Sequence, residues 1–119
     1  MGDPKLAADY ATNNAKSKSE GYCAKYVADA LTQANFQVDR QPSAYMYHTN
    51  GVLSNMGFYQ IDNNNPQKGD IYVQDKTQTH EDGHMAIYNG TNWVSDFIQK
   101  TDNVYANDAG PKYYYRYKK

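Results

Sequence analysis

One cysteine, three histidines and a group of acidic residues carry most of the chemistry that this sequence could perform. A single cysteine, Cys23, excludes an intrachain disulfide and a cysteine-based structural zinc site, so its role would be that of a thiol. It opens a strongly helical segment, where backbone N–H groups and the helix dipole would lower the thiol pKa. The same N–H groups could bind an oxyanion during acyl transfer. The competing interpretation is a small, buried hydrophobic residue.

A thiol hydrolase also needs a general base, and His84 is the best placed of the histidines. It follows Gly83 and opens a predicted strand, which is a rigid position beside a flexible glycine. His48 falls in a weakly predicted helix, where we expect a structural role. His80 belongs to an acidic polar loop, where we expect it to be solvated.

A third residue should hold the imidazole in its working tautomer. Residues 84–97 predict a β-hairpin, and a three-residue loop would place His84 opposite Asp96 on the same face. A two-residue loop would place Ser95 there instead, because one register step exchanges the faces. We predict Asp96 as the orienting residue, with Ser95 and Gln99 as lesser candidates. The competing interpretation of Asp96 is a solvated acid at a strand end.

Residues 80–84 (HEDGH) also match the H-E-x-x-H pattern of zinc peptidases. In those enzymes both histidines lie on one helix face and the glutamate is the base. Here an Asp-Gly pair interrupts the motif, and the next residues predict a strand that ends in a turn. No histidine or glutamate follows His84, so a third ligand would be Asp96, Asp102 or Asp108. A zinc metallopeptidase using His80, Glu81 and His84 is therefore an alternative; our first expectation is a site without metal.

These residues need helices and strands to position them. Asp3 and Pro4 predict a helix start, and an apolar stripe extends that helix to Asn14. The strongest helical pattern covers residues 22–31 and ends near Asn35, and a weaker one covers residues 45–53. Strands are then predicted at residues 58–61, 71–73, 84–88, 93–97 and, as an edge strand, 113–117. Helices followed by antiparallel strands predict an α+β fold with N-terminal helices packed on a small sheet.

The composition indicates one folded domain over residues 1–119. The mean hydropathy is -0.96, but 13 tyrosines supply rings that can be buried while their hydroxyls stay bonded. A net charge of -1 argues against a nucleic-acid binder. No stretch approaches the roughly 20 apolar residues of a membrane span, and the first ten residues lack the apolar centre of a signal peptide. We expect synthesis in the cytoplasm and no membrane partner.

Three segments, taken in order, resemble the CHAP amidases, which are relatives of the NlpC-type cell-wall peptidases with a papain-like fold. Residues 21–31 (GYCAKYVADAL) are similar to the nucleophile helix of that family. Residues 66–73 (PQKGDIYV) resemble its P-x-x-G-D strand, and residues 83–90 (GHMAIYNG) resemble its G-H-x-A-I strand with the catalytic histidine.

The resemblance implies a papain-like α+β fold and hydrolysis of amide bonds in the peptidoglycan stem peptide, without a metal or other cofactor. It implies that Cys23 attacks the carbonyl, that His84 takes and returns the proton, and that a polar residue orients the ring. The Cys23 amide would contribute to the oxyanion hole. The side-chain donor is left open, with three residues of the first helix as possibilities: Tyr10, Asn13 and Asn14.

Small single-domain members resemble two kinds of delivered lysin: a phage lysin, and an amidase effector that is paired with an immunity protein. Either would act as a monomer in the periplasm or cell wall after delivery by other machinery. A non-catalytic wall-binding or structural module is the alternative to an enzyme.

Overall fold

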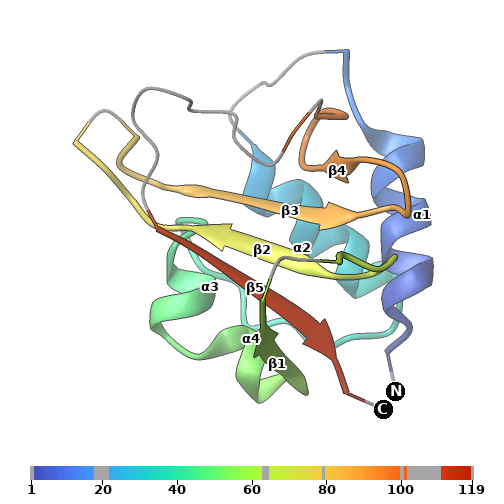
Figure 1. The fold of residues 1–119 in the computed structure, drawn as a ribbon, viewed down its shortest axis with the longest axis horizontal. Helices are drawn as coiled ribbons and strands as arrows, with labels where there is room; N and C mark the ends of the chain where they lie inside the picture. The colour runs from blue at the N-terminus through green and yellow to red at the C-terminus, as the bar shows by residue number, and fades with distance from the viewer. Residues whose placement is uncertain are drawn as a thin grey trace.

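The computed structural model describes residues 2–17, 22–62, 65–78, 80–99, 101 and 111–118. Within these ranges the helices precede the strands along the chain (Figure 1). The helices are α1 (Pro4–Asn14), α2 (Cys23–Gln33), α3 (Met46–Thr49) and α4 (Val52–Asn55). The strands are β1 (Phe58–Ile61), β2 (Ile71–Gln74), β3 (His84–Tyr88), β4 (Trp93–Val94) and β5 (Lys112–Tyr117). The predicted α+β class, with helices packed on an antiparallel sheet, is confirmed.

The strands form one antiparallel sheet in the order β1-β5-β2-β3-β4. The last strand, β5, lies between β1 and β2 and pairs with both, so its prediction as an edge strand is wrong. Two successive tyrosines of β5 explain this position. Tyr115 packs into the cluster on the helix side of the sheet, and Tyr114 packs into the cluster on the opposite face. A strand that buries rings on both faces is favoured in the interior of a sheet.

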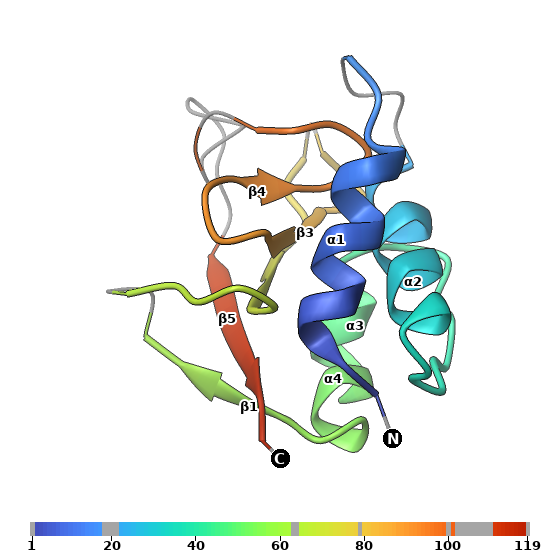
Figure 2. The ribbon, with the colours of Figure 1, turned by 90° about the vertical axis from the view of Figure 1, so that its right-hand side faces the viewer.

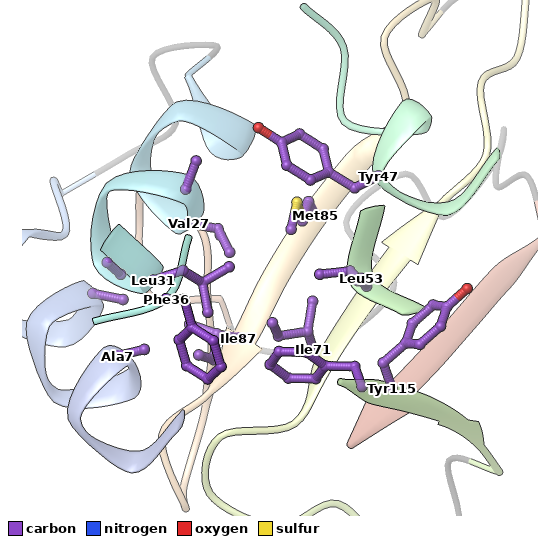
Figure 3. Close-up of a cluster of buried hydrophobic side chains, with 14 of the residues drawn as sticks. Ala7, Val27, Leu31, Phe36, Tyr47, Leu53, Ile71, Met85, Ile87 and Tyr115 are labelled. Atoms are coloured by element: carbon purple, nitrogen blue, oxygen red, sulfur yellow. The ribbon is translucent and has the colours of Figure 1, made fainter. Parts of the chain in front are cut away.

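The helices cover one face of the sheet (Figure 2) and enclose the main core there. Val27 and Leu31 of α2 point toward Ile87 and Met85 of β3 (Figure 3), and all four are fully buried. Alanines on α1, such as Ala7, let that helix pack closely against α2. The opposite face carries a smaller cluster of buried residues: Tyr72, Ala86, Trp93 and Tyr114.

Local signals set most of the element boundaries. The Asp3 side chain caps α1 by accepting from the Lys5 amide at 3.0 Å, as expected for this helix start. The predicted third helix is divided into α3 and α4 because Gly51 has a φ of 69°, which ends the helical run. Among the described residues, no helix is long and apolar enough to span a bilayer.

The G-D pair of residues 69–70 has a structural function. Asp70 is 2% exposed and accepts two hydrogen bonds from Arg116, Nε to Oδ1 at 2.9 Å and Nη2 to Oδ2 at 2.8 Å. This bidentate pair joins the start of β2 to β5. Gly69 lies so close to Pro4 that a Cβ would come within 2.7 Å of its ring. Asp70 therefore ties the start of β2 to β5, and Gly69 allows α1 to pack closely beside it.

Candidate active site

Cys23 is the first residue of α2 and lies beside the strand that carries His84. The backbone amides of Met85 and Ala24 are near enough to its sulfur to lower the thiol pKa. Met85 directly follows His84 on β3, so Cys23 lies near the start of the strand that carries His84, and the charge of Asp96 acts on both residues. The buried face of α2 packs on β3 and fixes this arrangement.

Burial raises the pKa of the Cys23 thiol from 9.0 to about 11. The backbone amides of Met85 and Ala24 act in the opposite direction, while the negative charges of Asp96 and Asp82 raise the pKa further. The lowered pKa expected at a helix start is therefore not found, because desolvation outweighs the amide groups. The resting sulfur carries its proton at neutral pH.

His84 is 2% exposed, and its Nε2 lies 2.7 Å from Oε1 of Gln99. The Gln99 nitrogen donates to the Thr101 carbonyl at 2.9 Å and to the Tyr72 hydroxyl at 3.0 Å. A carbonyl can only accept, so the nitrogen of the carboxamide faces Thr101 and its oxygen faces the ring. The ring Nε2 must therefore carry a hydrogen. In the neutral ring, Nδ1 is then the basic nitrogen.

Burial lowers the pKa of His84, while the hydrogen bond to Gln99 and the charge of Asp96 raise it. The net direction is downward, which keeps the ring neutral at pH 7. A neutral, oriented imidazole is the form required of a general base.

The predicted hairpin register is wrong. Tyr88 pairs with Trp93, so the loop has four residues and His84 does not face Asp96 across the hairpin. The cause is the Asn89 side chain, whose Oδ1 accepts from the amides of Thr91 and Asn92 and stabilises the longer turn.

Asp96 is fully buried, and its Oδ2 accepts from the Tyr22 amide at 3.0 Å, directly before the first turn of α2. Its charge raises the pKa of both Cys23 and His84. The Ser95 hydroxyl lies 3.4 Å from its other oxygen, Oδ1. Asp96 therefore anchors the nucleophile helix, and a role for it in catalysis stays a prediction.

Gln99, a lesser candidate from the sequence, reaches the ring because the chain turns sharply after β4. The Ser95 amide donates to the Phe97 carbonyl, and the Gln99 amide then donates to the Trp93 carbonyl at 2.8 Å. Residues 95–99 contain no glycine or proline that would signal such a turn. The sequence therefore carried only a weak indication that Gln99 and His84 would meet.

Gly83 shapes the entry to β3. It has a φ of 69°, and a Cβ at this position would lie 2.2 Å from the backbone oxygen of Gln74. A side chain does not fit in this contact, so position 83 requires glycine for the backbone to enter β3 at His84.

A cavity of about 360 Å³ opens beside Cys23. It is lined by residues 22–25 at the start of α2, by residues 40–42, and by Ala44, Tyr47 and Asp82. Its described lining includes none of the three residues considered as oxyanion donors; Tyr10 and Asn14 line a separate, smaller cavity of about 180 Å³.

The H-E-x-x-H segment forms a turn that leads into β3, and not a helix. His80 is half-buried before this turn and His84 lies on the strand, so they do not share a helix face. In the part of the chain that the structure describes, no three His, Cys, Asp or Glu side chains gather closely enough to hold a metal ion. Asp102 and Asp108, proposed as third ligands, lie outside the described residues.

His48, as expected, is structural, since it stacks on Tyr113 with ring centroids 3.6 Å apart.

The fold resembles solved structures of a type VI effector–immunity complex. The native type VI effector–immunity complex Tae3–Tai3 from Ralstonia pickettii contains a chain with a TM-score of 0.85 and 34% sequence identity, covering 98% of this chain and 99% of that one. The selenomethionine form of the complex gives a TM-score of 0.82 and 34% identity, covering 93% and 99%. No protein-family profile and no curated protein sequence matches this chain.

Proposed function

This chain belongs to the Tae3 family of type VI effectors, and we propose that it is a cysteine amidase or endopeptidase of the CHAP and NlpC type that cleaves peptidoglycan. The observation that carries this proposal is the hydrogen-bond arrangement at the start of β3. Gln99 fixes the tautomer of His84, and the backbone amide of the next residue, Met85, lowers the pKa of the Cys23 thiol. A thiol and an oriented neutral imidazole are the groups that nucleophilic acyl transfer needs.

In the first half-reaction, the Cys23 sulfur bonds to the carbonyl carbon of the substrate amide while its proton passes to Nδ1 of His84. Because the thiol pKa is about 11, the thiolate forms only during this transfer. The Cys23 amide at the N-terminus of α2 donates to the oxyanion. The carbon–nitrogen bond then breaks, His84 gives its proton to the leaving amine, and a thioester remains on Cys23.

In the second half-reaction, His84 takes a proton from water, and the resulting hydroxide bonds to the thioester carbon. The carbon–sulfur bond breaks, the acid product leaves, and the proton returns to Cys23. Gln99 Oε1 accepts the hydrogen bond from Nε2–H throughout and keeps the ring from rotating. Asp96 holds the start of α2 and, through its charge, stabilises the imidazolium that forms in each half-reaction.

Family membership favours a delivered effector over a phage lysin. The similar structures are of an effector in complex with an immunity protein. By analogy we propose that this chain is injected into the periplasm of a rival cell, acts there as a monomer on the stem peptide, and has a cognate immunity partner.

The test is digestion of purified sacculi, followed by mass spectrometry of the released fragments. We expect wild-type protein to release fragments with a new amine and a new carboxylate, and Cys23→Ala and His84→Ala to release none. His48→Gln is the matched histidine control, because His48 packs against β5 and should be dispensable. Full activity of the Cys23→Ala protein would disprove the thiol mechanism.

The same assay separates the alternatives. A zinc enzyme using His80 and His84 would lose activity with a chelator and with His80→Gln, whereas the thiol enzyme keeps it in both cases. A wall-binding module would sediment with sacculi and release no fragment.

A further inference from the structure

The cavity beside Cys23 has an unequal distribution of charge. Two cationic side chains, Lys25 and Arg40, line it together with one carboxylate, Asp82. Asp82 is engaged locally, since its Oδ1 accepts from the Ser43 hydroxyl at 2.6 Å. The cations come from α2 and from the segment after it, and Asp82 precedes β3.

Arg40 is held in place without using all its donors. Its Nη2 contacts Oδ1 of Asp29 at 2.8 Å and Oγ1 of Thr32 at 3.2 Å. A guanidinium has five N–H donors, and the two contacts require only those of Nη2. Among the described residues, Nε and Nη1 make no hydrogen bond or ion pair, and the side chain is 46% exposed. It can therefore accept an anionic ligand without losing its support.

The charges around the cavity balance in number, because Asp29 joins Asp82 as a second carboxylate beside the two cations. Asp29 also binds Lys25, Nζ to Oδ2 at 3.0 Å, so one carboxylate is shared by two cations. Lys25 is only two residues after Cys23, and its side chain is 64% exposed. An anion that approaches these two side chains would lie within one cavity with the nucleophile.

We propose that Arg40, assisted by Lys25, binds a free carboxylate of the stem peptide close to the scissile amide, and so determines which peptides are cleaved. This inference rests on the proposed function. Stem peptides carry free carboxylates next to several of their amide bonds, and some of these are replaced by carboxamides in amidated walls. Arg40 would favour the acid form through charge-assisted hydrogen bonds.

The experiment compares synthetic stem peptides in which one carboxylate at a time is replaced by a carboxamide. At one position, the acid form should have a KM at least about tenfold lower than the amide form, as expected for a hydrogen bond between charged groups. In Arg40→Gln the two KM values should fall within about twofold of each other, with kcat on the acid form nearly unchanged. Lys25→Gln should give a smaller loss of preference.

Lys68→Gln is the control, because Lys68 forms an ion pair with Asp9 outside this cavity and should leave the preference intact. An unchanged acid preference in Arg40→Gln, or no acid preference at any position in the wild type, would overturn the proposal. Binding of the same peptides to the Cys23→Ala protein, measured by calorimetry, needs no turnover. If the wild type cleaves no peptide but the Cys23→Ala protein still binds the acid form more tightly, the proposed reaction is rejected and the carboxylate site is supported.

Discussion

Replacement of Gln99 by leucine tests whether this residue orients the base. The change keeps the approximate volume but removes the oxygen that lies 2.7 Å from Nε2 of His84. Both side chains are almost fully buried, at 1% and 2% exposure, so water cannot replace the lost partner easily. An unsatisfied buried donor costs about 1–3 kcal/mol. If that cost appears in the transition state, kcat falls by about 5- to 150-fold.

The pH profile distinguishes this role from a purely structural one. The hydrogen bond to Gln99 raises the pKa of His84, so its removal lowers that pKa. His84 acts as a base only when it is deprotonated, and activity therefore increases as the pH rises through its pKa. In Gln99→Leu the acid limb of the profile should move to lower pH while the plateau falls. The measurement is the rate of peptide hydrolysis between pH 4 and 9, a range around the reference pKa of about 6.5.

Gln74→Leu is the matched control, and it carries a prediction of its own. Gln74 pairs with His84 in the β2–β3 register and is fully buried, yet its carboxamide bonds to none of the described residues. Its replacement should keep the pH profile and increase the free energy of unfolding by about 1 kcal/mol, because an unpaired polar group is removed. The reasoning about Gln99 fails if its variant keeps the acid limb in place and retains kcat within twofold of the wild type.

Three further predictions concern the elements that position the site. Gly83→Ala should lower the free energy of unfolding by about 2 kcal/mol or more, because its Cβ would clash with the backbone oxygen of β2, 2.2 Å away. Gly51→Ala, with a φ of 69° and nothing within 4 Å, should cost only about 1 kcal/mol in the same urea titration. Asp70→Asn should cost about 3 kcal/mol, because it breaks a buried bidentate pair, against less than about 1 kcal/mol for the exposed Asp9→Asn. Alkylation of Cys23 by iodoacetamide should accelerate as the pH rises toward 11, because only the thiolate reacts.

Each of these can be contradicted directly. Equal costs for the two glycine variants would show that the contact in β2 relaxes freely. Equal costs for the two aspartate variants would mean that the buried pair contributes no more than a surface pair. An alkylation rate that is already at its plateau at pH 8 would show that the thiol pKa is not raised.

Local patterns in the sequence were sufficient for the helix starts and for the positions of Cys23 at the start of α2 and His84 at the start of β3. Asp3 and Pro4 begin α1 through backbone preferences that act over three or four residues. The position of Cys23 at the start of α2, and of His84 after Gly83, follows from periodicity and glycine conformation in the same way. These features depend only on residues close together in the chain.

The tertiary structure decided the rest. Pairing of β5 between β1 and β2 joins residues far apart in the sequence, and no local pattern predicted it. The turn that brings Gln99 to His84 closes through the Trp93 carbonyl, without a glycine or proline to mark it. The pKa of Cys23 rises because neighbouring elements remove its water. Pairing, contact and desolvation are properties of the assembled fold, which is why the hydrogen-bond partner of His84 and the protonation of the thiol could not be read from local sequence patterns.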